Sequence, residues 1–316
     1  MSVHIGEAAP AAVAGRRPAG LFRTVTRERR GAAVGLGILA VFVVLSVFAP
    51  YLAPYSTTDG TCAVYAPPSP RHWLGCDDGG VDMLSLLMRG GQTSLVVGFT
   101  ATLVSILIGG AVGLASGYFG GWTDVALMRV TDCLLVLPDL VLAMVIAAVW
   151  GPSLFHVILV IGLLEWTATA RIVRAEVMSL RERAYVKRAR GLGAGDARVI
   201  VRHVLPHVGP LLIANTVLTV SAAIYMETAL AFLGLEDPGV TTWGTILQHA
   251  FARTAISSNA WWAIVPDGFV IAAVSVGCFL LGQAIEDALN PRLKVAHLSA
   301  RRWRLRTLAG KGADAR

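Results

Sequence analysis

The sequence predicts an all-α integral membrane protein with six transmembrane helices. Of its 316 residues, 55% are hydrophobic and only 15% are charged, whereas a soluble domain carries about 25% charged residues. Long stretches contain no Asp, Glu, Lys or Arg, and each can hold the roughly 20-residue helix that crosses a bilayer. The composition therefore excludes a soluble globule and any disordered or fibrous class.

Apolar runs separated by Gly and Pro define the six spans. They are residues 31–53, 94–118, 129–149, 153–171, 209–233 and 263–286. The third span contains Asp132 and Asp139 with Pro138 between them, which predicts a kink and carboxylates that are buried or face water. The first run is longer than the apolar core of a secretory signal, about 7 to 15 residues, so it predicts a retained helix.

Lys and Arg residues set the orientation. With the amino terminus inside, 24 of the 27 lie on the cytoplasmic side, so both termini are expected there. The expected parts are a basic amino-terminal tail (1–30), the six-helix domain (31–290) and a basic carboxy-terminal tail (291–316). The domain contains an external loop (54–91) and a cytoplasmic loop (172–208).

The net charge of +7 is expected to attract membrane lipid rather than nucleic acid, because no basic stripe is interleaved with aromatic residues. The carboxy-terminal tail is rich in Arg. It either binds anionic headgroups or is a plain solvated tail.

The cysteines and histidines predict no metal site. Cys62 and Cys76 lie in the external loop, where oxidation is permitted, and they either form a disulfide or remain free thiols. His203 and His207 are four residues apart, but Pro206 between them distorts the spacing. The His-Glu-x-x-His arrangement of zinc peptidases is absent.

The cytoplasmic loop carries the most informative pattern. Residues 174–190 mix charged and apolar residues as an amphipathic helix does. Residues 191–195 form a glycine-rich break, after which Asp196 is placed to N-cap a second short helix. Pro206 is expected to end or kink that helix. This protruding helix, turn and helix would suit docking on a soluble partner, and the alternative is a solvated basic loop.

This loop resembles that of the membrane subunits of binding-protein-dependent ATP-binding-cassette importers. Their pattern is Glu-Ala-Ala, three residues, Gly, nine residues, then Ile-x-Leu-Pro. The matching positions are Ala189, Gly193, Leu205 and Pro206. The positions that differ are Lys187, Arg188 and His203.

Other segments resemble the C-type permeases of dipeptide, oligopeptide and nickel importers. They are His72-Trp73-Leu74-Gly75, Gly117-Tyr118-Phe119-Gly120-Gly121-Trp122, Phe232-Leu233-Gly234-Leu235 and Asp287-Ala288-Leu289-Asn290-Pro291. The resemblance covers roughly residues 25–295. It implies a type I importer-like permease fold in the cell membrane of a prokaryote, with the cytoplasmic loop as its coupling helix.

The resemblance also implies partners and cargo. The chain would pair with a second homologous permease subunit, two cytoplasmic ATP-binding subunits and an extracytoplasmic substrate-binding protein, and form half of the path for short peptides. Nickel or another small solute is the alternative cargo. A stand-alone secondary transporter is less favoured, because no convincing internal repeat is seen. The chain lacks the phosphate-binding motif Gly-x-x-x-x-Gly-Lys-Ser/Thr, so it is not expected to be an ATPase. It is expected to hold no cofactor, and ATP and Mg would bind the partner ATPase subunits.

No catalytic residue is expected, and the candidate residues fall into two sets. The ATPase-coupling loop consists of Tyr185, Lys187, Arg188, Ala189, Leu192, Gly193, Ala194, Gly195, Asp196, Leu205 and Pro206. Asp132, Asp139 and Glu227 either line the path or pair with a neighbouring subunit or helix end. Glu165 is expected to form an interfacial ion pair with Arg171.

Overall fold

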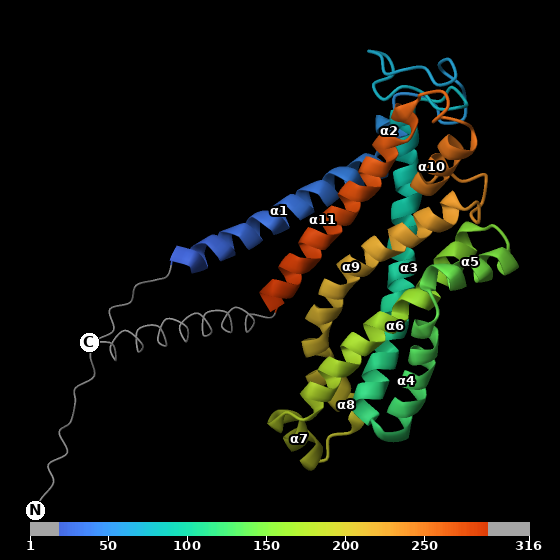
Figure 1. Ribbon diagram of the computed structural model, residues 1–316. Helices are drawn as coiled ribbons and strands as arrows, with labels where there is room; N and C mark the ends of the chain where they lie inside the picture. Colours follow the sequence, from blue (N-terminus) through green and yellow to red (C-terminus); the bar gives the residue numbers. More distant parts are fainter. Residues whose placement is uncertain (1–18, 290–316) are drawn as a thin grey trace, which may run out of the picture.

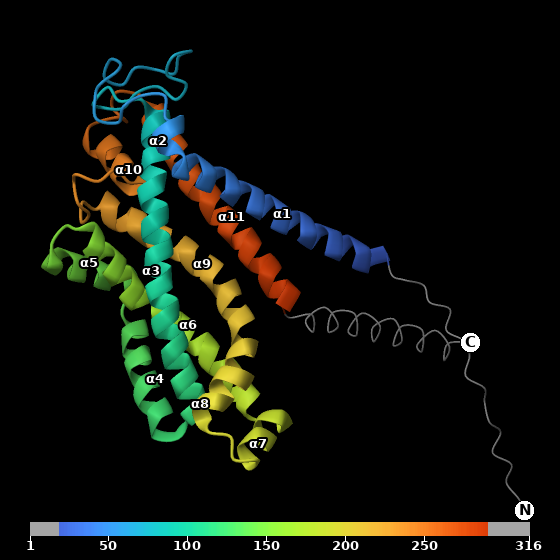
Figure 2. The ribbon, with the colours of Figure 1, turned by 180° about the vertical axis from the view of Figure 1, so that it is seen from behind.

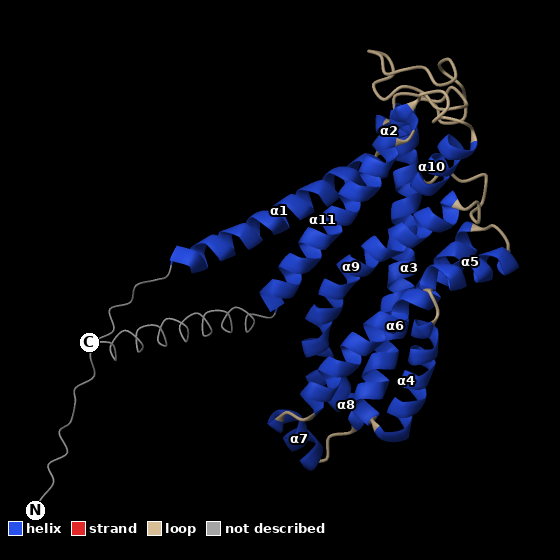
Figure 3. Ribbon diagram, viewed as in Figure 1, coloured by secondary structure: helices blue, strands red, loops and turns tan. Residues whose placement is uncertain are grey.

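The computed structural model describes residues 19–289, and the regular elements in that range are helices (Figures 1 and 3). Five helical segments are long and apolar enough to cross a membrane, or six if one bent helix pair counts as a single span. The predicted all-α membrane fold is therefore confirmed. Most of both predicted tails lies outside the described residues.

The long helices extend beyond the predicted spans. They are α1 (Ala19–Val47), α3 (Met83–Phe119), α6 (Leu154–Arg181), α9 (Leu205–Phe232) and α11 (Val265–Leu289). These helices reach into the predicted tail and loops. Residues 19–30 belong to α1, residues 83–91 to α3 and residues 172–181 to α6. Hydropathy marks only the apolar length of a helix, whereas its backbone hydrogen bonds continue until a residue breaks them.

The third predicted span is a broken helix. The α4 helix (Gly121–Val136) and the α5 helix (Asp139–Trp150) meet at 90°. Pro138 causes the bend, because the residue before a proline is kept extended, and Leu137 has φ −83° and ψ 140°. The predicted kink is thus confirmed.

An ion pair joins α4 to α6. Arg174 on α6 donates from Nε and Nη2 to the two carboxylate oxygens of Asp124 on α4, at 2.6 and 2.7 Å. The Asp124 side chain is only 17% exposed. This two-pronged contact therefore fixes α4 along α6.

Helices α3 and α6 pack closely through three glycines on α3. A Cβ atom at Gly109, Gly113 or Gly117 would lie 2.6, 2.6 or 2.8 Å from a backbone carbonyl oxygen of α6. The four-residue spacing places these glycines on one face of the helix, as in the small-residue interfaces of membrane helices. Larger side chains would separate the two helices, so the glycines set their distance.

The short α10 helix (Trp243–Ala252) packs against α3 and α9. Trp243 is fully buried, and its Nε1 donates to the Leu87 carbonyl oxygen of α3 at 3.0 Å. Gly244 contacts α9, because a Cβ there would lie 2.8 Å from the Thr228 carbonyl oxygen. The sequence patterns did not predict this helix.

The other helices are arranged around α3 and α6, and α3 extends between two opposite ends of the molecule (Figure 1). Helix α1 packs on α11, and both run away from the α4 and α6 side in the two views (Figures 1 and 2). Residues 53–82, here called the cysteine loop, lie at one end beside α2 (Ala49–Leu52) and η2 (Trp261–Ala263). Helices α7 (Ala184–Gly191) and α8 (Asp196–Val199) lie at the opposite end.

Candidate functional site

The segment of residues 182–204, here called the α7–α8 segment, begins where α6 ends. The predicted single amphipathic helix over 174–190 is wrong, because Glu182 and Arg183 separate α6 from α7. Arg183 has an extended backbone, with φ −69° and ψ 143°. The break turns the chain so that Val186 reaches the apolar cluster that already holds Val177 and Leu180.

A tight turn connects α7 to α8. Gly193 has φ +81°, which favours glycine because a side chain would meet the backbone. The turn caps α7 through two backbone hydrogen bonds, from Gly193 N to the Arg190 carbonyl at 2.9 Å and from Ala194 N to the Ala189 carbonyl at 3.1 Å. Leu192, in this turn, is 89% exposed.

The predicted N-cap of the second helix is wrong, and of the two effects predicted for Pro206, an end or a kink, the structure contradicts the end. Gly195, not Asp196, is the N-cap of α8, because the Asp196 side chain is bound by Tyr118 instead. Pro206 does not end the helix, since α8, the π-helix η1 (Ile200–Val204) and α9 run on continuously. The wider π-turn comes just before Pro206, and such local irregularity is how a helix accommodates a residue without an N–H group.

The inner face of the α7–α8 segment is apolar. Val186, Val199 and Val204 are buried with Tyr118 of α3 and Val173 of α6. Ala189 and Ala194 pack against the same cluster. The segment is therefore held on the ends of α3 and α6 by apolar packing.

Tyr118 adds polar contacts to this packing. Its side-chain hydroxyl donates to Asp196 Oδ1 at 2.7 Å and accepts from Arg190 Nε at 3.3 Å. The Arg190 guanidinium also lies 4.3 Å from the centre of the Tyr118 ring. Arg181, at the end of α6, donates to the Tyr118 carbonyl oxygen at 3.0 Å. The sequence reasoning missed these roles, because the partners are 63 to 78 residues apart.

The outer face of the segment is basic, and the segment also exposes the apolar side chains of Leu192 and Val201. Its exposed residues include Arg183, Tyr185, Lys187, Arg188, Leu192, Gly193 and Gly195. Lys187 pairs with Glu182 at 2.7 Å and holds the pKa of that carboxyl below its ordinary value. The structure thus brings nine of the eleven predicted coupling residues into one small projection, while Leu205 and Pro206 lie in the first turn of α9.

The three candidate path carboxylates lie in different surroundings. Asp132 on α4 binds Arg171 on α6 at 2.6 Å. The predicted pair between Arg171 and Glu165 is therefore wrong, because Asp132 takes the guanidinium. Asp139 is exposed at the start of α5, whereas Glu227 is fully buried on α9.

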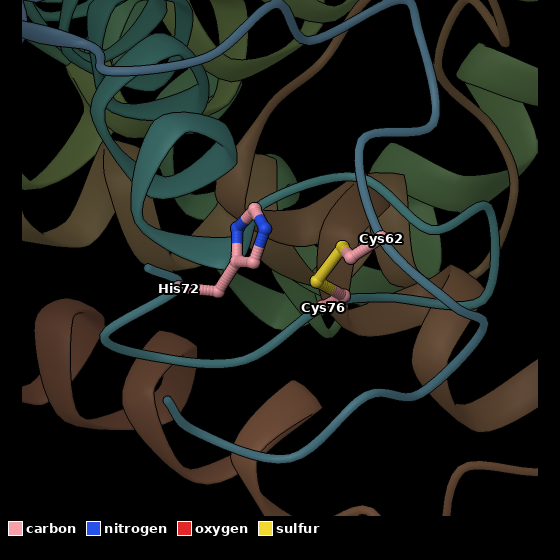
Figure 4. A group of neighbouring side chains, drawn as sticks. All are labelled: Cys62, His72 and Cys76. Carbon is pink, nitrogen blue, oxygen red and sulfur yellow. A yellow bond between two sulfur atoms is a disulfide. The ribbon is translucent and has the colours of Figure 1, made fainter. Parts of the chain in front are cut away.

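The cysteine loop contains a disulfide beside a histidine. Cys62 and Cys76 are joined through their sulfur atoms, with Cα atoms 6.6 Å apart, and a His72 ring nitrogen lies within 4.8 Å of both sulfurs (Figure 4). Because the sulfurs are bonded to each other, they offer no thiolates to a metal. His72 Nδ1 bonds Asp82 Oδ1 at 3.0 Å, and Asp82 caps α3 through Ser85 N. These contacts fasten the loop to the start of α3.

Comparisons with known proteins give consistent matches. Residues 95–295 match the family model of binding-protein-dependent transport system inner membrane components. Residues 19–68 match the N-terminal TM domain of oligopeptide transport permease C.

Two relatives cover most of the chain. A dipeptide transport system permease protein of Alkalihalophilus pseudofirmus is 34% identical over 271 residues, which are 85% of this chain and 88% of the relative. An oligopeptide transport system permease protein of Mycobacterium tuberculosis is 37% identical over 270 residues, which are 84% of this chain and 91% of the relative.

A solved structure shares the fold. The inward-facing MetNI methionine ABC transporter superposes with a TM-score of 0.51 at 16% identity, over 66% of this chain and 97% of the matched chain. At this identity the likeness concerns the fold alone.

Proposed function

Since the chain belongs to the family of binding-protein-dependent transport system inner membrane components, we propose that it is the permease subunit of an ATP-driven importer of short peptides. The observation that carries this proposal is the match of more than four fifths of the chain to dipeptide and oligopeptide permeases. The separate match of residues 19–68 to an oligopeptide permease domain supports the same cargo.

The proposed complex contains a second homologous permease, two cytoplasmic ATPase subunits that bind ATP and Mg²⁺, and an external substrate-binding protein. The α7–α8 segment would face the cytoplasm and the cysteine loop would lie outside, since they are at opposite ends of the molecule (Figure 2). The distribution of Lys and Arg supports this orientation, because 24 of the 27 then lie inside.

In the proposed cycle the α7–α8 segment is the coupling helix. Closure of the ATPases on ATP would move the segment, and hydrolysis would return it. The contacts of Tyr118 with Arg181, Arg190 and Asp196 support transmission of this movement to α3 and α6. The glycine-packed α3–α6 pair would then move as one body and open the path to alternate sides.

The test of the proposal is to purify the tagged chain from its native membrane and identify the proteins that copurify. We expect a second permease and ATPase chains in stoichiometric amounts. After reconstitution in liposomes with its binding protein, the complex should take up labelled dipeptides only with ATP. A folded chain that purifies alone and moves solute without ATP would refute the importer, and uptake of nickel chelates in place of peptides would refute the cargo.

Gly193 provides a test of the coupling role. Gly193→Leu imposes a left-handed backbone on a side chain, which costs about 1–2 kcal/mol, and adds bulk to the docking surface. We expect membrane insertion and ATP hydrolysis to persist while uptake falls. Gly195→Leu separates the two effects, because Gly195 has φ −65° and a Cβ there also meets nothing within 4 Å, so this variant adds bulk to the same surface without the left-handed strain. Full uptake by the Gly193→Leu complex would contradict the coupling role.

A further inference from the structure

Two glutamates meet in the protein interior where α3, α9 and α10 converge. Glu227 lies on α9 and is fully buried. Glu236, on the connection between α9 and α10, is 2% exposed. The two carboxyl groups are neighbours, and Thr242 lies beside both. The described ion pairs include neither glutamate, so no described basic side chain neutralises these carboxyl groups.

Side chains from four parts of the chain close the site. Ser94 on α3 donates to Glu227 Oε1 at 3.4 Å and accepts from Trp243 N at 3.1 Å. Thr242, at the start of α10, donates to Glu236 Oε2 at 2.9 Å. These contacts place both carboxyl groups at the start of α10, independently of their contact with each other.

One carboxylate oxygen of the site has no hydrogen-bond donor. Thr228 donates to Glu227 Oε2 at 3.4 Å, so both oxygens of Glu227 accept from hydroxyl groups. The Thr242 hydroxyl has one hydrogen, which goes to Glu236 Oε2. The remaining oxygen, Glu236 Oε1, is buried and has no donor. An acceptor left unpaired in this way is costly, whereas a proton on a carboxyl group converts it to a donor.

We propose that Glu227 and Glu236 share one proton in a carboxylic acid–carboxylate hydrogen bond, and that this bond fastens the α9–α10 connection to α9. Two adjacent buried carboxylates with no basic side chain beside them do not both remain ionised, because burial and their mutual repulsion oppose the second charge. A single shared proton removes one charge and supplies the missing hydrogen. The pair is thus a proton-binding site that holds the α9–α10 connection on α9, and Ser94 links Glu227 to α3.

The surroundings support the retention of a proton. Burial raises the pKa of Glu236 to about 7, and the neighbouring charge of Asp237 acts in the same direction. Alkaline solution would remove the shared proton and leave two like charges in contact. The fastening of the α9–α10 connection would then be lost.

Infrared absorption of protonated carboxyl groups tests the proposal on the purified full-length protein and three variants. The variants are Glu227→Gln, Glu236→Gln and the double substitution. Glutamine keeps the shape of the side chain, and its amide donates the hydrogen bond that the proton supplied. Glu286→Gln, which changes an exposed glutamate on α11, is the matched control and should lose no absorption.

One shared proton predicts that each single variant and the double variant lose the same absorption, that of one carboxyl group. No loss in any variant would show that both groups are ionised. A loss in the double variant twice that of each single variant would show two separate protons, and either result overturns the proposal. Wild-type protein labelled with ¹³C-glutamate needs no substitution. It must show a glutamate band that disappears on alkaline titration, and absence of that band also overturns the proposal.

Discussion

The Tyr118 hydroxyl joins α3 to the α7–α8 segment, and Tyr118→Phe removes that hydroxyl alone. The hydroxyl donates to Asp196 at 2.7 Å and accepts from Arg190 at 3.3 Å. Hydrogen bonds to charged groups contribute about 1.5–3 kcal/mol each. Asp196 is exposed, so water can replace the lost donor, and Arg190 keeps an aromatic ring beneath it. The expected net cost is therefore at the lower end, about 1.5 kcal/mol.

Hydrogen–deuterium exchange of the α7 and α8 amides measures this loss. A cost of about 1.5 kcal/mol makes local opening roughly tenfold more frequent. Tyr185→Phe is the matched control. No described hydrogen bond involves the Tyr185 hydroxyl, and the Tyr185 ring stacks on His207. Equal exchange in the two variants would refute the reasoning. In the assembled complex, Tyr118→Phe should also lower peptide uptake per ATP hydrolysed.

Three further predictions concern stability, each measured by unfolding of the purified chain. Reduction of the Cys62–Cys76 disulfide, whose cysteines are 14 residues apart, should cost about 3 kcal/mol; alkylation of both cysteines in unreduced protein would contradict the disulfide. Arg174→Ala removes both guanidinium donors from a carboxylate that is only 17% exposed and should cost about 2 kcal/mol, whereas Lys187→Ala at an exposed pair should cost much less, so equal losses would count against the Asp124–Arg174 contact. Burial raises the pKa of Glu236 from 4.5 to about 7, so the folded state keeps a proton that the unfolded state releases. Wild-type stability should therefore fall as the pH rises from 4.5 to about 7, and persistence of this fall in Glu236→Gln would exclude Glu236 as its cause.

Local patterns predicted the features that depend on neighbours in the sequence. The apolar runs predicted the long helices, because a span must bury about 20 apolar residues in lipid. Pro138 predicted the bend between α4 and α5, since proline restricts the residue before it. The glycine-rich break predicted the turn at Gly193. The Gly-x-x-x-Gly-x-x-x-Gly spacing at 109–117 was also present in the sequence and would have predicted the close α3–α6 contact.

Tertiary packing decided the remaining features. The amphipathic pattern continues past Arg181, yet the helix breaks there because Val186 gains burial by turning back. Asp196 is of a residue type that favours the N-cap position. Its side chain instead accepts a hydrogen bond from the Tyr118 hydroxyl, 78 residues away in the sequence. Glu227 and Glu236 lie beside residues of α3 and α10 that no local pattern connects with them. The sequence by itself determined which segments are apolar enough to enter a membrane, because transfer to lipid depends on local composition. Only the tertiary structure decided which polar groups meet, because those contacts depend on how distant helices pack.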